Sequence, residues 1–290
     1  MKWFWLVLAA CGGGDDATPD AAADPCAHAP GAPVAVGTID VGSSELSGLA
    51  ASHTVDNLLW THGDHGGTAE IYGVSATTAA AHGTLHLDAT AEDWEDIATA
   101  PCIEGHCIYV ADTGDNDLNR ASVAIFVVPE PTSDPIGVIA TPFVKYDVMY
   151  PDGAHNVEAV FVDPRDEVVY AIEKVASKHA NVYKLPLIAT ATSLAVLVAQ
   201  LTIPGDDPRV TAADLVIDDC NARLAIRTYG ALYELRAEAT ASIPDLLAGA
   251  LAAMPVADEP HGEAVAYSAD GHAYFTTSEG DLPALSRVSD

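Results

Sequence analysis

The chain has 290 residues, of which 49% are apolar, so it can bury a sizeable core, and an all-β chain of this length commonly forms one domain. Only 12 Lys and Arg face 42 Asp and Glu, which gives a formal charge of −30. Such a surface repels nucleic acid and anionic lipid head groups but favours divalent cations, so nucleic acid is excluded as a partner. Acidity that only keeps an exposed protein soluble would give the same composition.

Residues 1–10 have the features of a lipoprotein signal peptide. Lys2 precedes a short apolar run, and Leu8-Ala9-Ala10-Cys11 matches the bacterial lipobox. The run is too short to span a bilayer, which takes about 20 apolar residues. We expect cleavage before Cys11, lipidation of Cys11 (palmitate included), and export to the bacterial cell envelope, on its periplasmic or cell-surface side, with the lipid as the only membrane contact. The alternative is an ordinary signal peptide with a chance cysteine.

Residues 11–32 are rich in Gly, Ala, Asp and Pro without periodicity, which predicts a flexible linker. Beyond this linker, a short element recurs at intervals of about 50 residues, the length of one propeller blade. Each copy has a polar or acidic residue followed by small and branched apolar residues: Ser47-Gly-Leu-Ala, Glu95-Asp-Ile-Ala, Glu158-Ala-Val-Phe, a weaker copy at 211–216 with Asp214 at the acidic position, and Glu263-Ala-Val-Ala.

Each copy is followed by further predicted strands. Second strands are expected at 58–61, 108–111, 168–172, 224–227 and 273–277, third strands at 70–74, 123–127, 181–185 and 231–235, and outer strands at 83–88, 142–149 and 194–203. These blades of four strands predict an all-β domain over 33–290, a β-propeller most consistent with five blades.

The last repeat supplies only three strands before the chain ends. We expect residues 33–41 to pair as its fourth strand, which closes the ring and removes an exposed edge. One segment, 243–254, is rich in apolar residues and alanine and predicts a short inserted helix with Ser242 as its cap. The long third repeat leaves six blades open, whereas an α/β sheet would need more helices.

Four further cysteines are expected to be oxidised in an exported protein. Cys102 and Cys107 bracket a predicted hairpin turn and can form a disulfide across it. Cys26 precedes the closing strand and Cys220 lies in a turn on the same face, so this pair can lock the N-terminal strand to the ring.

In a propeller, the starts of the inner strands and the ends of the second strands converge at one mouth of the central channel. Glu95, Glu158 and Glu263 begin inner strands, and like charges at this spacing repel one another unless they bind a cation. Ca²⁺, which takes six to eight oxygen ligands, fits them; protonation, pairing with Lys174 and Arg227, or a water-filled channel lining are the alternatives. The remaining candidates for a ligand-binding face are His62, Asp64, His65, Asp112, Asp115, Asn116, His155, Asn156, Glu173, Lys174, Arg227, Tyr229, His261 and Glu279.

The histidines show no zincin pair, and no Gly-x-Ser-x-Gly elbow is present, so the sequence indicates no specific hydrolase. Trp60 and Trp94 are expected to pack between blades.

A resemblance adds to this interpretation. The phrases Asp93-Trp-Glu-Asp-Ile-Ala, Tyr109-Val-Ala-Asp-Thr-Gly-Asp-Asn and Gly262-Glu-Ala-Val-Ala-Tyr resemble those of uncharacterised secreted bacterial β-propeller lipoproteins, and more distantly the phytase-like and SdiA-regulated propellers. The resemblance implies calcium in the channel at Glu95, Glu158 and Glu263. The first copy departs from it because Ser47 is not acidic, and a phytase site needs more basic residues than Lys174 and Arg227.

Two functions follow as hypotheses. The first is a non-catalytic, monomeric envelope protein whose polar face binds a small molecule, a glycan or a protein. The second is a calcium-dependent hydrolase of phosphoesters, lactones or esters, in which the metal activates water and a Glu or His moves protons.

Overall fold

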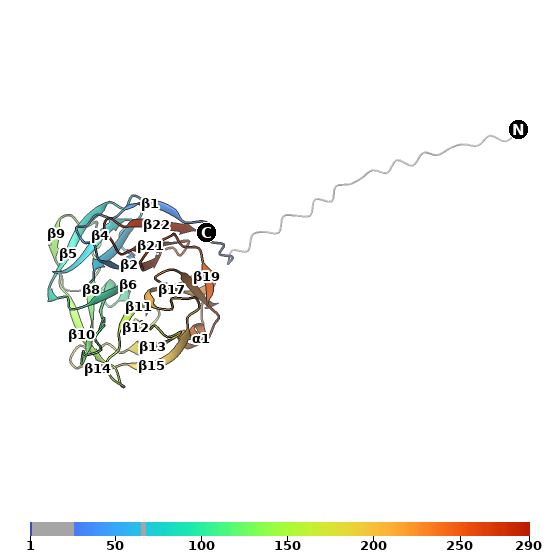
Figure 1. Ribbon diagram of the computed structural model, residues 1–290. Helices are drawn as coiled ribbons and strands as arrows, with labels where there is room; N and C mark the ends of the chain where they lie inside the picture. Colours follow the sequence, from blue (N-terminus) through green and yellow to red (C-terminus); the bar gives the residue numbers. More distant parts are fainter. Residues whose placement is uncertain (2–25, 65–67) are drawn as a thin grey trace.

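Five blades surround a central channel in the computed structural model, which describes Met1, residues 26–64 and residues 68–290. Figure 1 shows the outer strands β5, β10 and β15 at the periphery, with β2, β6 and β11 nearer the centre. The inner strands contact one another in the ring order β2, β6, β11, β16, β20 and back to β2. The predicted five-bladed propeller is therefore confirmed.

The blades follow the chain in order. Blade 1 contains β2 (Leu46–Ala51), β3 (Leu58–Gly63), β4 (Thr68–Ser75), β5 (Ala81–Thr90) and β9 (Val138–Ala140); blade 2 contains β6 (Trp94–Cys102), β7 (Gly105–Asp112), β8 (Val123–Pro129), β10 (Val144–Met149) and β14 (Ser193–Leu194). Blade 3 contains β11 (Val157–Asp163), β12 (Val168–Glu173), β13 (His179–Leu185) and β15 (Val196–Thr202). Blade 4 contains β16 (Val210–Ile217), β17 (Asn221–Thr228), β18 (Leu232–Glu238) and β19 (Ala252–Met254), and blade 5 contains β20 (Gly262–Tyr267), β21 (Ala273–Ser278), β22 (Ala284–Ser289) and β1 (Val34–Thr38).

The N-terminal strand closes the ring as expected. β1 pairs antiparallel with β22, with Val34 opposite Arg287 and Thr38 opposite Ala284, and the two strands lie side by side in Figure 1. This pairing satisfies the outer edge of blade 5 with a strand from the other end of the described chain. The Cys26–Cys220 disulfide joins the segment before β1 to the turn between β16 and β17 in blade 4, which confirms that predicted pair.

The long third repeat has a local explanation. After β8 the chain leaves blade 2, and β9 adds a parallel strand to β5 of blade 1 before β10 returns to blade 2. The short strand β14 likewise leaves blade 3 to pair in parallel with β10. These exchanges add strands to the edges of neighbouring blades and not a sixth blade.

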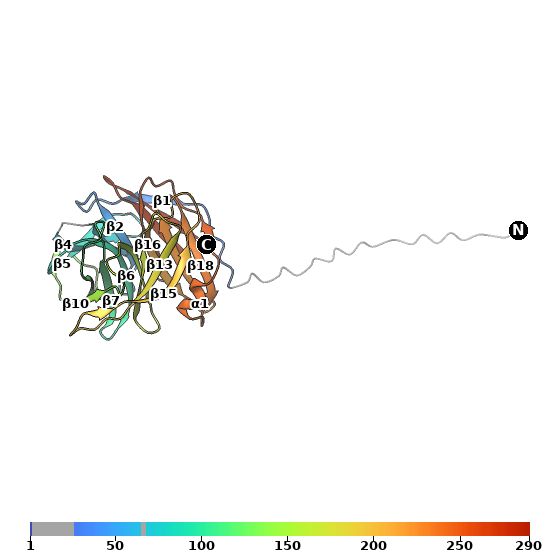
Figure 2. The ribbon, with the colours of Figure 1, turned by 60° about the horizontal axis from the view of Figure 1, so that its bottom comes forward.

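The predicted helix is too long. The α-helix α1 covers only Ile243–Leu247, with Ser242 as its N-cap as expected, and it lies beside β18 (Figure 2). Residues 252–254 instead form β19, the outer strand of blade 4, which pairs with Leu232–Glu234. A short run of alanines and apolar residues is compatible with both a helix and an edge strand, so its periodicity does not distinguish the two structures.

Each interface between adjacent blades has its own buried apolar cluster, so the core forms a ring of five clusters. Trp60 and Trp94 lie between blades 1 and 2, as predicted, and are almost fully buried. The Cys102–Cys107 disulfide, also predicted, fastens the β6–β7 hairpin. Among the described residues, no helix is long and apolar enough to cross a membrane.

Candidate functional site at the channel mouth

A β-bulge lies at the start of the inner strands and turns one side chain out of the regular alternation. In β6, Trp94 pairs with Asp112 and Asp96 pairs with Ala111, which leaves Glu95 as the extra residue. The same interruption leaves Glu158 unpaired in β11 and Glu263 unpaired in β20. Bulges often re-aim a side chain next to a binding site, and here they bring three glutamates to the same mouth of the channel.

The pairing of β16 with β17 corrects the predicted position of the acidic residue in the fourth repeat. In β16, Val210 pairs with Thr228 and Ala212 pairs with Arg227, so the residue at the glutamate position is Thr211 and not Asp214. Asp214 lies three residues further along the strand, away from the mouth. The sequence pattern gave the wrong residue because the fourth copy has its acid three residues beyond the bulge and none in the bulge itself.

The mouth is a cavity of about 190 Å³, which we call the channel mouth. Glu95, Glu158 and Glu263 are only 5%, 2% and 8% exposed. The cavity is lined by Leu46, Ser47, Asp64, Glu95, Asn116, Glu158, Lys174, Tyr229, Glu263 and Glu279. The structure therefore brings together the three predicted metal-binding glutamates with five of the predicted face residues.

Three carboxylates form a tight group beside this cavity, and two of them, Asp64 and Glu95, belong to its lining. One oxygen from each of Asp64, Asp93 and Glu95 lies within 4.8 Å of the other two. The loop after β7 passes directly over them, since a Cβ built on Gly114 would lie 2.0 Å from Glu95 Oε1 and 2.4 Å from Asp93 Oδ2. A glycine is thus required at position 114 to leave room for these oxygens.

Positive charge lies around Tyr229, which lines the same cavity. Lys174 Nζ forms an ion pair with the buried carboxylate of Glu158 and lies 4.9 Å from the centre of the Tyr229 ring. The Arg209 guanidinium lies 4.6 Å from the same ring and is paired with Asp207 at 2.5 Å. A second hollow of about 300 Å³, lined by Asp207, Arg209, Tyr229, Pro260, His261 and Glu279, adjoins the channel mouth and shares Tyr229 and Glu279 with it.

Burial dominates the electrostatics of the glutamates. It raises the pKa of Glu95 well above its usual range, and the charges of Glu158, Asp64 and Asp93 raise it further. Burial also raises the pKa of Glu263, to about 8, against the opposing charge of Lys174. Glu158 shows the same upward shift of its pKa from burial, which the contact with Lys174 reduces. Without a bound cation, the mouth therefore retains protons near neutral pH.

Several predicted face residues build the loops around the mouth. Asp112 accepts the backbone N–H groups of Glu92 and Asp93 and pairs with Arg120 at 2.8 Å. Asp115 accepts the N–H groups of Asn119 and Arg120. Asn156 connects this loop to the site, because its side chain accepts from Asp115 N and donates to Asn116 and Glu158.

The predicted histidines divide into separate environments. His155 contacts Glu173 through Nδ1 at 2.7 Å and Asp152 through Nε2 at 2.9 Å. Burial opposes its protonation, but the hydrogen bonds to Glu173 and Asp152 and the charges of these two acids together outweigh burial and raise the pKa of His155. His261 lies in the adjoining hollow against Tyr229. His62 is fully buried against Trp94, where burial lowers its pKa, and His65 lies outside the described residues.

Arg227 is not at the mouth. Its side chain is fully buried, pairs with Glu259 at 2.9 Å, and lies so close to β20 that a Cβ on Gly262 would fall 1.7 Å from Nη2. Of the two cations that we considered as ion-pair partners of the glutamates, only Lys174 therefore remains. Arg209, which lines the hollow that adjoins the mouth, was missed because it precedes β16 in a polar loop without any motif.

A larger hollow, of about 440 Å³, lies beside the Cys102–Cys107 hairpin and includes none of the mouth residues. Its lining is mainly apolar, with charged side chains from Glu104, Asp166, Glu167 and Lys184.

No protein-family model matches the sequence, and no curated protein matches it. Among solved structures, the chain is similar to an auxiliary nutrient binding protein from Bacteroides thetaiotaomicron, with a TM-score of 0.49 and 10% identity over 89% of this chain and 76% of that one. It is also similar to a gluconolactonase from Xanthomonas campestris, with a TM-score of 0.48 and 12% identity over 89% of each chain.

Proposed function

We propose that the propeller binds a small polar ligand at the channel mouth together with a divalent cation, for which Ca²⁺ is the best match. The observation that carries this proposal is the group of Asp64, Asp93 and Glu95, whose oxygens lie within 4.8 Å of one another beside an open cavity. Carboxylate oxygens are the ligands that Ca²⁺ prefers.

The spacing of these oxygens supports a calcium ion. Ca²⁺–oxygen distances of about 2.3–2.6 Å place two ligands of one ion at most about 4.6–5.2 Å apart. All three oxygens satisfy that limit, and the close approach of Gly114 leaves them a cradle that a side chain would fill. Glu158 is already paired with Lys174, so we assign the direct ligands to Asp64, Asp93 and Glu95 and keep Glu158 and Glu263 as neighbours that tune the charge.

The rest of the mouth suits a ligand with hydroxyl or carboxylate groups. Lys174 and Arg209 flank Tyr229, and Asn116 supplies an amide at the rim. A phosphate-rich substrate fits less well, because Arg227 is buried and does not line the mouth, and Arg209 is already paired with Asp207.

A calcium-dependent hydrolase of lactones, esters or phosphoesters is the second candidate. It is favoured by Glu263, whose pKa of about 8 lets a carboxyl group accept or donate a proton near neutral pH. A bound cation would supply Lewis acidity and a more acidic water molecule. In this candidate function Glu263 moves the proton, and Lys174 holds the polar end of the substrate.

Calorimetric titration with Ca²⁺ tests the cation proposal. We expect one ion per chain in the wild type and at least tenfold weaker binding in Asp64→Asn, whereas the exposed control Glu104→Gln should bind like the wild type. Equal affinities in all three proteins would overturn the proposal. Turnover of a panel of lactones, esters and phosphomonoesters with and without Ca²⁺, repeated with Glu263→Gln, separates the hydrolase from the binding protein.

We also propose that the protein is lipid-anchored in the cell envelope through Cys11, which lies outside the described residues. The lipobox and the Gly- and Ala-rich stretch after it support this proposal. Labelling with palmitate should mark the wild type, and Cys11→Ser should release unlabelled protein. A labelled, membrane-bound Cys11→Ser variant would contradict it.

A further inference from the structure

Two histidines and an aspartate from distant parts of the sequence meet where the ring closes. His28 lies in the segment before β1, His272 lies in the turn between β20 and β21, and Asp290 follows β22. His28 Nδ1 is 2.5 Å from Asp290 Oδ2, and His272 Nδ1 is 3.9 Å from the same oxygen. All three ligand atoms lie within 4.8 Å of one another, and none of the three residues lines the channel mouth.

We propose that His28, His272 and Asp290 bind a Zn²⁺ ion that fastens the N-terminal segment to blade 5, as a second closure of the ring beside the Cys26–Cys220 disulfide. Two imidazole nitrogens and one carboxylate oxygen are a common three-residue zinc set, with a fourth position left for water. We call these three residues the seam site.

The distances suit such an ion after small side-chain movements. Zn²⁺ bound tetrahedrally at about 2.0–2.1 Å requires its ligand atoms to be about 3.3 Å apart. The observed separations of 2.5 Å and 3.9 Å lie on either side of that value. The side chain of His272 is 71% exposed and can rotate inward, whereas that of His28 is only 6% exposed and is held in place.

A second carboxylate orients His28, as is usual for histidines that bind zinc. Asp218 Oδ2 lies 3.3 Å from His28 Nε2, on the side of the ring opposite Asp290. Nε2 thus faces Asp218 while Nδ1 is directed at the seam site, and in the zinc-bound form a hydrogen bond from Nε2–H to Asp218 would complete a carboxylate–histidine–zinc triad.

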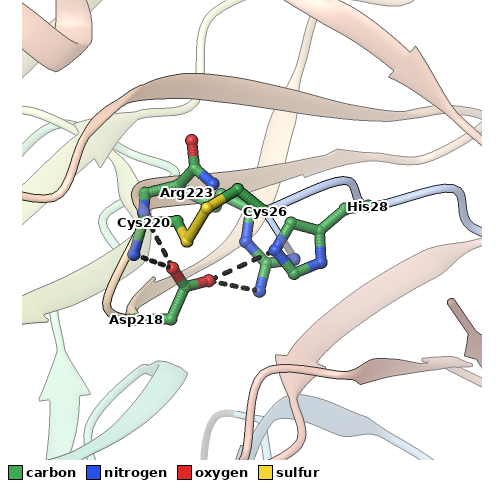
Figure 3. The surroundings of a disulfide bond; sticks show 6 residues. Cys26, His28, Asp218, Cys220 and Arg223 are labelled. Carbon is green, nitrogen blue, oxygen red and sulfur yellow. Dashed lines mark hydrogen bonds and ion pairs between the residues drawn. A yellow bond between two sulfur atoms is a disulfide. The ribbon is translucent and has the colours of Figure 1, made fainter. Parts of the chain in front are cut away.

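Asp218 is itself firmly held, as Figure 3 shows. Its Oδ1 accepts the backbone N–H groups of Cys220 and Asn221, both at 2.7 Å, and its Oδ2 also contacts Arg223. The disulfide between Cys26 and Cys220 fixes the backbone only two residues before His28. On the other side, Asp290 N donates to the carbonyl of His272 at 3.1 Å. The backbone positions of all three proposed ligands are therefore set before any metal binds.

The test uses the full chain, stripped of metal with a chelator and titrated with Zn²⁺ by calorimetry. We expect one ion per chain and at least tenfold weaker binding in His272→Ala, an exposed substitution that leaves the fold intact. The matched control is His82→Ala, because His82 forms an exposed pair with Asp134 at 2.7 Å but has no third ligand nearby in the described structure. His272→Ala binding like the wild type, or a loss of the same size in His82→Ala, would refute the seam site.

Two further measurements separate this site from others. Asp64→Asn at the channel mouth should leave Zn²⁺ affinity unchanged, and loss of binding there with none in His272→Ala would overturn the proposal. Asp218 is a positioning residue, so Asp218→Leu should weaken binding about 10–100-fold while Asp218→Asn, which still accepts from Nε2–H, retains most of the affinity. Replacement of Zn²⁺ by Co²⁺ should give a tetrahedral visible spectrum that His272→Ala changes and Asp64→Asn does not.

Discussion

Glu95 and Asp96 are adjacent acids on the same inner strand, both almost fully buried, yet they meet opposite surroundings. The Asp96 carboxylate accepts three backbone N–H groups, from Ile97 at 2.9 Å, Val160 at 2.8 Å and Ala213 at 3.1 Å, and so joins blades 2, 3 and 4 across the channel. Glu95 instead faces Asp64 and Asp93 beside an open cavity. A buried acid whose hydrogen bonds are satisfied by backbone groups is structural, whereas one that faces other carboxylates is poised for a ligand.

Replacement of Asp96 should have the largest effect. Asp96→Ala leaves three buried N–H groups without acceptors, and each such group costs about 1–3 kcal/mol. We expect a loss of about 4–6 kcal/mol in the free energy of unfolding, measured by urea denaturation, or failure to accumulate folded protein. Asp96→Asn keeps one acceptor oxygen and should cost less. A stability equal to the wild type for Asp96→Ala would show that the carboxylate does not hold the inner strands together.

The pH dependence of stability tests whether a glutamate at the channel mouth holds a proton in the folded protein. Burial raises the pKa of Glu263 to about 8 in the folded protein, above its usual 4.5. The native state thus binds the proton more tightly, so this contribution is fully present below pH about 4.5 and is lost as the pH rises to about 8.

We expect metal-free protein to lose on the order of 2–4 kcal/mol over this range through Glu263. Urea denaturation at pH 5 and pH 8 in the presence of a chelator measures the slope, which Glu263→Gln should flatten. The exposed control Glu104→Gln should keep the wild-type slope. If all three proteins show the same slope, Glu263 does not hold its proton in the folded state.

Bound Ca²⁺ should offset the loss of stability that ionised carboxylates cause at the channel mouth. A ligand at a hundredfold excess over its dissociation constant stabilises the native state by about 2.7 kcal/mol. Glu95→Gln should remove most of this gain while making the metal-free protein slightly more stable, because it relieves repulsion from Asp64 and Asp93. Thermal unfolding with Ca²⁺, with Mg²⁺ and with chelator measures both effects. Equal stabilisation by the two ions in wild type and variant would indicate only screening of a strongly acidic surface.

The inner strands, the closure of the ring and the three glutamates of the channel mouth could all be predicted from the sequence. The recurring small and branched residues identify the inner strands, because each strand is buried on both sides and needs compact side chains. The missing fourth strand of the last repeat predicts closure by residues 33–41, since an unpaired edge is costly. Glu95, Glu158 and Glu263 follow from the same repeat.

What the sequence could not show depends on contacts between distant segments. Two of the three donors to Asp96 come from other blades, and β9 pairs with a neighbouring blade, so no local pattern reveals either. His62 resembles a loop histidine in sequence but ends a strand against Trp94. The seam site joins residues 28, 272 and 290, which only the closed ring brings together.

The smallest effect is expected at the two positions where the repeat lacks its acid. Ser47 Oγ donates to the carbonyl of Glu95 at 2.5 Å, and Thr211 Oγ1 donates to the carbonyl of Gly262 at 2.7 Å, so each hydroxyl links its inner strand to that of the next blade. Ser47→Ala and Thr211→Val should each lower the free energy of unfolding by about 1 kcal/mol, the usual net value of one such hydrogen bond. Because neither hydroxyl belongs to the acidic group, Ca²⁺ affinity should stay within about twofold of the wild type. Loss of calcium binding in Ser47→Ala without loss of stability would place this serine among the ligands and redraw the boundary between structural and binding positions in the inner strands.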